Sequence, residues 1–222
     1  MQHKILTAYF ELPTDKIELY SFSELFGSAI YLLLPDERHG GVINQNNKKR
    51  YSDFVFNVMK FKNKLKFNFS SIVDSDYKIL TEAILENRFK LGDIHISRTS
   101  VSIENVTTIV DEPIFIKGIV SLNKREGKKK IFKDIRDDDF INKLELNLFS
   151  KTSALIGHKH DFMPKFEIAR LGRSHVIFYK QIGHLAHEVV LKSLLDETTA
   201  NVLFHAGLGS GNAKGIGFMR AI

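Results

Sequence analysis

Cysteine is absent from this 222-residue sequence, and so is any long apolar run. Without cysteine the chain can form neither a disulfide nor a zinc site built on thiolates. No apolar stretch reaches the length that spans a bilayer, and the opening Met-Gln-His-Lys leads straight into a strand-like segment. We therefore expect no membrane span, no signal peptide, no membrane partner and a cytoplasmic location.

Two common phosphate-binding motifs are missing from the glycine-rich stretch Gly207–Gly217. The stretch lacks the Gly-Lys-Ser/Thr ending of a nucleotide-binding P-loop. A dinucleotide fingerprint must open a helix inside a βαβ unit, and only five residues follow Gly217. We therefore expect neither nucleotide fold at this point.

The same stretch contains two Gly–apolar–Gly triplets around a five-residue insert that carries Lys214. Glycine accepts positive φ and allows close backbone approach, so amide N–H groups of such a loop can turn toward a phosphate. Lys214 would add positive charge. The alternative interpretation is a glycine-rich hairpin before a last strand.

The composition indicates a folded, basic protein. The sequence is 43% hydrophobic with 18 Phe, and its net charge is +6 with a pI of about 9.3. This balance favours a polyanionic partner such as nucleic acid, although a soluble basic protein has the same composition.

Hydrophobic periodicity predicts the same order of elements twice. In the first half we expect strands at 4–12, 51–59, 65–70, 93–97 and 100–110 and helices at 21–34 and 75–89. In the second half we expect strands at 114–122, 166–169, 176–179 and 188–194, a basic hairpin at 123–130, and helices at 137–155 and 198–205. The order predicts an α+β protein with two tandem ferredoxin-like (βαββαβ) domains and antiparallel sheets, residues 1–111 and 112–222.

The C-terminal spacing resembles the glycine-rich motif of the CRISPR-associated endoribonucleases that cut precursor CRISPR RNA within its repeats. The matching positions are Gly207, Leu208, Gly209, Lys214, Gly215, Ile216 and Gly217. Further positions fit the order of the family's motifs, namely Pro113, Asp139–Phe140, Asn147–Leu148 and Lys151. The family's strand Phe-Thr-Phe-Ser has only a loose counterpart in Arg50–Asn57.

RNA cleavage without metal needs a base for the 2′-hydroxyl proton, an acid for the leaving 5′-oxygen and cations for the charge of the transition state. His39 lies in a polar loop after the first helix, next to Gly40 and Gly41, and Lys48 and Lys49 follow in the same loop. Histidine suits the proton transfers because its pKa lies near neutrality.

The resemblance implies that His39 moves protons, that Tyr31 assists and that Lys48 or Lys49 holds the phosphate. It also implies cleavage to a 2′,3′-cyclic phosphate and a 5′-hydroxyl, with no cofactor. Ordinary alternatives are a loop histidine on the surface and a tyrosine in helix packing. The sequence does not distinguish Lys48 from Lys49.

Cations and glycines are the expected RNA contacts, and solubility is the alternative explanation for the cations. The predicted set is Arg50, Lys124, Arg125, Lys128, Lys129, Lys130, Arg170, Arg173, Gly207, Gly209, Lys214, Gly215 and Gly217.

Other polar clusters have simpler explanations. His158, His160 and Asp161 lack the spacing of a metallohydrolase, and residues 137–139 form an acidic helix start, so we expect no metal site. His184 and His187 are three apart on a strand and would face opposite sides. We expect His205, beside the glycine loop, to pack or cap, and contact with RNA is the alternative.

The expected partner is CRISPR repeat RNA, with contacts to effector subunits and homodimer formation left open. Two alternatives to the endoribonuclease remain. One is a non-catalytic repeat-binding subunit of an effector complex, and the other is an unrelated RNA-binding ferredoxin-like protein.

Overall fold

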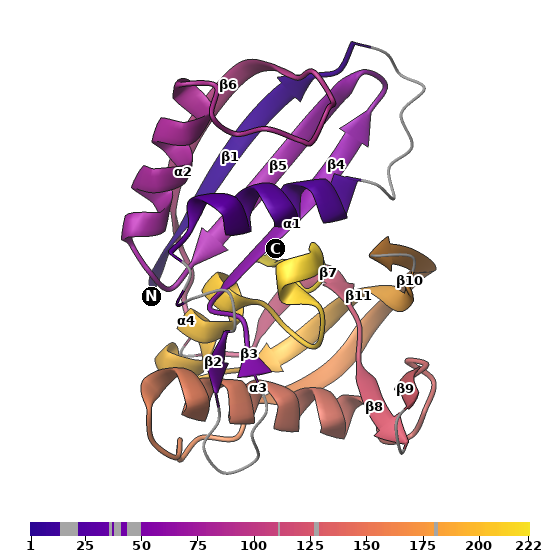
Figure 1. Ribbon diagram of the computed structural model, residues 1–222. Coiled ribbons are helices and arrows are strands. Elements are labelled where there is room, and N and C mark those ends of the chain that lie inside the picture. Colours follow the sequence, from indigo (N-terminus) through magenta and orange to yellow (C-terminus); the bar gives the residue numbers. More distant parts are fainter. Residues whose placement is uncertain are drawn as a thin grey trace.

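The structure is a computed structural model that describes residues 1–13, 22–35, 37, 41–43, 50–110, 112–126, 129–179 and 182–222. Only the backbone is described for 124–126 and 129–130. The first half contains β1 (Gln2–Glu11), α1 (Phe22–Leu33), β2 (Val42–Ile43), β3 (Arg50–Tyr51), β4 (Phe54–Phe61), β5 (Lys64–Ser71), α2 (Ser75–Leu85) and β6 (Ser97–Thr107) (Figure 1). The second half contains β7 (Ile114–Val120), β8 (Asn123–Glu126), β9 (Lys129–Phe132), α3 (Phe140–Ile156), β10 (Lys165–Tyr179), β11 (Ile182–Leu194), α4 (Glu197–Ala206), the 3-10 turn η3 (Asn212–Lys214) and β12 (Met219–Ala221).

Two four-stranded sheets share one topology. Their strand orders are β4-β5-β1-β6 and β10-β11-β7-β12, and every neighbouring pair is antiparallel. Numbered within its own half, each sheet reads 2-3-1-4, with a helix after its first strand and another after its third. This is the ferredoxin-like arrangement, and it confirms the predicted fold class.

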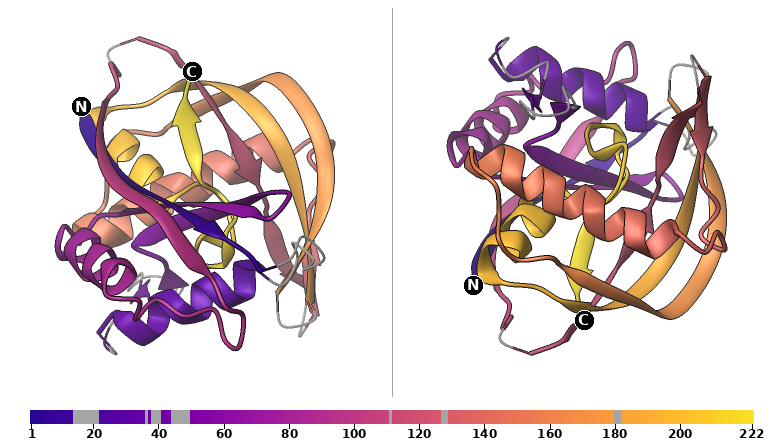
Figure 2. Two further views of the ribbon diagram at one scale, coloured as in Figure 1. Left: turned by 90° about the horizontal axis from the view of Figure 1, so that it is seen from above. Right: turned by 90° about the horizontal axis from the view of Figure 1, so that it is seen from below.

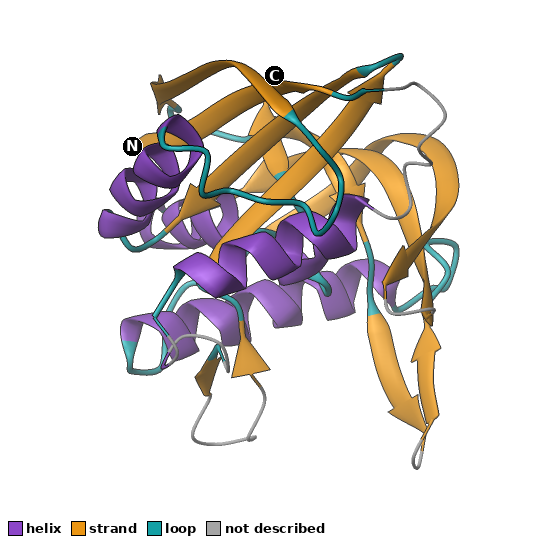
Figure 3. Ribbon diagram, turned by 45° about the horizontal axis from the view of Figure 1, so that its top comes forward, coloured by secondary structure: helices purple, strands orange, loops and turns teal. Residues whose placement is uncertain are grey.

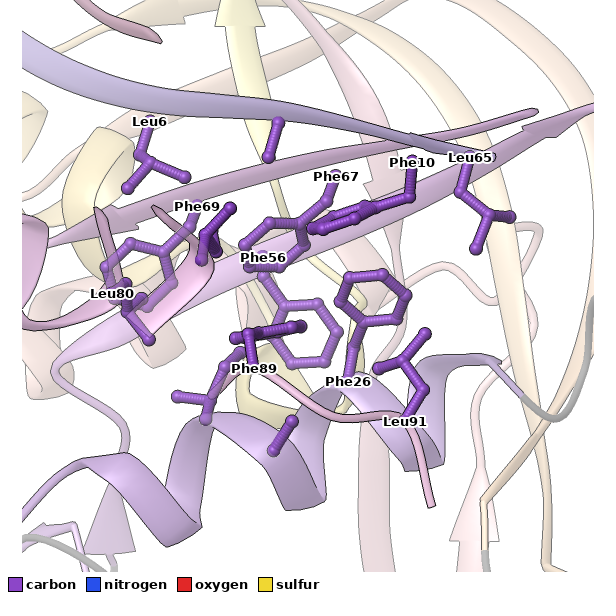
Figure 4. Packing of buried hydrophobic residues seen from close by; sticks show 14 of the residues in the cluster. Leu6, Phe10, Phe26, Phe56, Leu65, Phe67, Phe69, Leu80, Phe89 and Leu91 are labelled. Carbon is purple, nitrogen blue, oxygen red and sulfur yellow. The ribbon is translucent and has the colours of Figure 1, made fainter. Parts of the chain in front are cut away.

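Phenylalanine builds the core of the first unit (Figure 4). Alternate residues of β5, Leu65, Phe67 and Phe69, point to the helices, as the period of two requires. Phe26 of α1 stacks on Phe67 with ring centroids 4.8 Å apart and lies 5.5 Å from Phe89. The aromatic contacts therefore fix α1 on the sheet.

The C-terminal segment joins the two units. The second unit has its own core between its sheet and helices α3 and α4. Ala213 of the glycine-rich segment packs instead against the first core, and Phe218 forms a small buried cluster with Ile5 and Val55. In Figures 1 and 2 the yellow segment at the C-terminal end accordingly lies against the sheet and helix α1 of the first unit.

The strand predicted at 93–97 was wrong, and the strands predicted at 166–169 and 176–179 were found but without the predicted break between them. The expected strand at 93–97 is a turn with an isolated bridge between Leu91 and Ile94, where Gly92 has φ +57°. The expected strands 166–169 and 176–179 are one strand, β10, whose pairing with β11 continues through two register shifts. The charged side chains between them stay in solvent, so the sequence carried no apolar alternation there.

The basic hairpin and the polar loop after α1 contain short strands. β8 and β9 pair as a hairpin that extends away from the body of the molecule (Figure 3). In the loop, β2 pairs with β3 and lies beside α3 of the second unit (Figure 1). No helix in the described ranges is both long and apolar enough to cross a membrane.

Candidate functional site

The glycine-rich segment follows α4 and folds on itself. Five of its glycines, 207, 209, 211, 215 and 217, have φ between +74° and +91°. A methyl group on Gly217 would overlap the side-chain nitrogen Nδ2 of Asn212 and the backbone carbonyl oxygen of Leu208. Glycine is therefore required at this position both by φ and by space.

Lys151 of α3 holds the segment from inside the protein. Its side chain is 1% exposed, and its ammonium donates to the carbonyls of Ala206 (3.1 Å) and Gly207 (2.6 Å) and to Asn212 Oδ1 (2.6 Å). The Asn212 amide in turn donates to the carbonyls of Leu208 and Ile216, at 3.1 Å each. A buried cation needs such acceptors, so Lys151 and Asn212 fix the shape of the loop.

Several amides of the predicted phosphate loop are bonded within the protein. The N–H of Gly207 donates to Leu203 O (3.0 Å), that of Ser210 to Ser121 O (2.7 Å) and that of Gly217 to Ile119 O (2.8 Å). Gly207, Gly209 and Gly217 are buried, whereas Lys214 of the insert and Gly215 of the second triplet are half-buried. The accessible part of the loop is thus the insert, except for the buried Asn212, together with Gly215.

The insert packs on one stripe of α1. A methyl on Gly27 would lie 3.3 Å from Ala213 O, and one on Gly215 would lie 2.9 Å from Ser23 Oγ. Ser23, Gly27 and Tyr31 follow at intervals of four, so they share one helix face. The structure therefore places Tyr31 one turn beyond the loop contact, with its ring 5.5 Å from that of Phe54.

Lys214 lies where α1, the loop and the β10–β11 hairpin meet. Its Nζ is 4.8 Å from the ring centroid of Tyr179 and 3.4 Å from His184 Nε2. Tyr179 Cε2 would be 3.7 Å from a methyl on Gly27. Burial, and then the charge of Glu24, raise the pKa of Tyr179, so this ring stays neutral beside the ammonium.

His184 connects Lys214 to the basic hairpin. Its side chain is buried in β11, and its ring lies 4.7 Å from that of Phe132 at the end of β9. Phe132, His184, Lys214 and Tyr179 therefore form a continuous row of contacts from the root of the hairpin to α1.

The remaining predicted cations do not gather at this point. Arg170 and Arg173 are exposed on β10. Nine residues separate Arg170 from Tyr179, which is roughly 30 Å along a strand. Arg50 is exposed on β3, in the ribbon beside α3.

The other polar clusters have structural partners. His160 Nε2 lies 3.0 Å from Thr199 Oγ1 and 3.1 Å from Asp196 Oδ2, at the start of α4. His205 Nδ1 donates to Asn201 O at 2.9 Å, and Asp139 pairs with Lys133 and Lys143. Within the described residues no three His, Asp or Glu side chains are grouped as metal ligands.

Residues 100–221, more than half of the chain, match the family described as "CRISPR associated protein Cas6, C-terminal". The chain belongs to the Cas6 family. No curated protein shows a significant match to it.

Solved structures with the same fold include Cas6-related and RNA-bound proteins. A Cas6-related protein from Pyrococcus furiosus has a TM-score of 0.77 at 14% identity, covering 100% of this chain and 99% of that one. A RAMP protein binding different RNA substrates has a TM-score of 0.76 at 15% identity, covering 99% and 100%. Cse3 of Thermus thermophilus, bound to an RNA representing a pre-cleavage complex, has a TM-score of 0.53 at 10% identity, covering 99% of each chain.

The residues implied by the Cas6 resemblance are only partly placed. His39, Lys48, Lys49 and Lys128 lie outside the described residues, and the side chains of Lys124, Arg125, Lys129 and Lys130 are not described. Tyr31 lies on the face of α1 that is contacted by the loop carrying Lys214, although the two residues are far apart in the sequence.

Sequence reasoning missed Tyr179 and the position of His184. The sequence pattern relates His184 only to His187. Its contact with Lys214 arises because the β10–β11 hairpin folds back onto the loop, and no short-range pattern signals such an approach. The sequence identifies Lys151 only as a position that fits the family pattern, whereas the structure shows which groups its ammonium contacts.

Proposed function

We propose that this protein is a metal-independent endoribonuclease that cleaves precursor CRISPR RNA within its repeats. The observation that carries the proposal is the glycine-rich loop held against Ser23 and Gly27, on the stripe of α1 that continues to Tyr31, with the Lys214 ammonium near this contact. The proposal takes residues 1–111 as the domain that supplies the proton-transfer groups and 112–222 as the domain with the loop.

The proposed reaction is an internal transesterification. The 2′-oxygen attacks the adjacent phosphorus, the bond from phosphorus to the 5′-oxygen breaks, and a 2′,3′-cyclic phosphate and a 5′-hydroxyl result. One group takes the 2′-hydroxyl proton and another protonates the leaving oxygen. We assign proton transfer to His39, assistance to Tyr31 and charge stabilisation to Lys48 or Lys49.

Relatives support RNA as the partner. The Cse3 structure is of an RNA-bound pre-cleavage complex, and another Cas6 structure, with a TM-score of 0.65 at 13% identity, is a product complex. The protruding β8–β9 hairpin carries a run of Lys and Arg residues in the sequence, which suits contact with phosphates outside the cleavage site. Arg50, Arg170 and Arg173 would likewise contact phosphates away from the cleaved bond.

Cleavage of labelled repeat RNA in EDTA tests the proposal. Wild type should cut at one position, and His39→Ala should bind the RNA but leave it intact. His95→Ala is the matched control, since His95 is an exposed histidine in the turn before β6 and should cut normally. Reversible loss of wild-type cleavage in chelator would exclude the metal-independent mechanism.

A non-catalytic repeat-binding role is the second candidate. The RAMP protein described as binding different RNA substrates has the same fold over the whole chain, and this likeness supports a binding role as an alternative. Tight binding of repeat RNA without any cut by wild type would establish this second function.

A further inference from the structure

We infer that Lys214 is a catalytic cation at the cleaved phosphate and that His184 and Tyr179 are its positioning residues. This inference rests on the proposed endoribonuclease function. It adds a group from the second domain to the residues that the sequence assigns to the first.

The backbone around Lys214 is fixed on both sides. Ala213 O approaches Gly27, and Gly215 approaches Ser23 Oγ. Both contacts are on α1, the helix that also carries Tyr31. Lys214 therefore lies where the loop meets α1, whereas the cations of the β8–β9 hairpin lie on an element that extends away from the body of the molecule.

The ammonium is also held at its end. The face of Tyr179 attracts it through a cation–π contact at 4.8 Å, and His184 Nε2 at 3.4 Å can accept a hydrogen bond from it. This geometry requires a neutral His184 with its proton on Nδ1, since an imidazolium would have no acceptor nitrogen. The two contacts limit the many rotamers of a lysine to one region.

The chemistry needs a cation that is already in place. As the 2′-oxygen attacks, negative charge grows on the two non-bridging oxygens of the phosphate. A donor fixed before the reaction stabilises that charge without reorganisation during the step. Lys214 is half-buried, and its neighbour Ala213 meets α1 at Gly27, one turn before Tyr31, so Lys214 meets this requirement.

The matched variants separate charge from packing. Lys214→Met keeps the apolar stem on Tyr179 and removes the ammonium, and Lys90→Met removes an exposed ammonium elsewhere. His184→Gln keeps a buried acceptor, whereas His184→Leu keeps volume without one.

Single-turnover cleavage with saturating protein is the measurement. Lys214→Met should lower the rate constant about 100-fold with RNA affinity changed little, which is the usual loss for one transition-state donor. Lys90→Met should match wild type. A substrate with sulfur in place of the leaving 5′-oxygen should not restore Lys214→Met, because charge on the non-bridging oxygens is unchanged.

His184 should act only through Lys214. His184→Leu should lower the rate about tenfold and His184→Gln less than threefold, within the range that small misplacements cause. In the Lys214→Met background His184→Leu should have no further effect, whereas a purely structural role would persist there.

The outcomes distinguish the two proposals. If wild type cleaves and Lys214→Met cleaves equally fast at saturation, or if sulfur restores it, the inference fails and the proposed function stands. If wild type binds repeat RNA without cleaving it, the proposed function fails and the inference with it.

Discussion

Single buried polar side chains connect parts of this molecule that are far apart in the sequence. Lys151 closes the glycine-rich loop through three acceptors, although it belongs to α3. His3 of β1 stacks on Phe204 of α4 with centroids 4.5 Å apart and meets His205 edge-on at 6.0 Å. Both contacts join elements that no local pattern would pair.

The His3 contact predicts pH-dependent stability. Burial, then the charges of His205, Arg220 and the N-terminal amine, lower the pKa of His3 to about 4, and burial lowers the pKa of His205. The unfolded chain then binds more protons than the folded one below pH 6.5, so stability falls as pH falls. His3→Phe, which keeps the stacked ring, should reduce this loss.

Urea unfolding between pH 7 and pH 5 measures the effect, since ordinary carboxyl groups titrate lower. The midpoint should fall less with pH in His3→Phe than in wild type. Equal slopes for the two proteins would show that His3 contributes nothing to the dependence.

The conformation of the glycine-rich loop is stabilised mainly by buried residues. Its two Gly–apolar–Gly triplets bury Leu208 and Ile216, and the partly exposed residues are those of the insert, apart from Asn212, and Gly215. The sequence motif is therefore mainly a folding requirement.

A matched pair of glycines tests this view. Gly217→Ala should destabilise the protein at least about 2 kcal/mol more than Gly157→Ala, because only the first adds an overlap to the unfavourable φ. Gly157 has φ +82°, close to the +91° of Gly217, but nothing lies within 4 Å of an added methyl there. Chemical denaturation of both variants measures the difference, and equal losses would contradict a packed loop.

An element could be predicted from the sequence where one of its faces is buried, because burial leaves an apolar pattern. The α1 stripe and the alternation of β5 were visible because one face of each is buried, and the loop was visible through its glycine spacing. The middle of β10 was not, because Arg170 and Arg173 stay in solvent while the backbone keeps its ladder. The Lys214 site could not be predicted, since Tyr179 and His184 reach it only through the return of a hairpin.

At the scale of the whole molecule the two ferredoxin-like units share buried surface. Phe218, at the end of the loop, is 5% exposed and packs with Ile5 and Val55 of the first sheet. Arg220 of β12 donates to Asn68 Oδ1 of β5 at 2.8 Å. The last strand of the second sheet thus also stabilises the first.

Phe218→Ala should therefore destabilise the first unit. The expected cost is about 3 kcal/mol, typical of a buried phenylalanine, and amides of β1 and β4 should exchange faster with deuterium. Phe115→Ala is the control, since Phe115 is 43% exposed on β7. Unchanged exchange in β1 and β4 would mean that the units are independent.

The packing of Ala213 and Phe218 on the first unit also has a consequence for synthesis. These two residues leave the ribosome more than one hundred residues after β6. At about 5–20 residues per second the first unit waits roughly 5–20 s with Ile5 and Val55 uncovered. A nascent chain would complete the contact between the loop and α1, on which the proposed function rests, only when translation of the loop is finished.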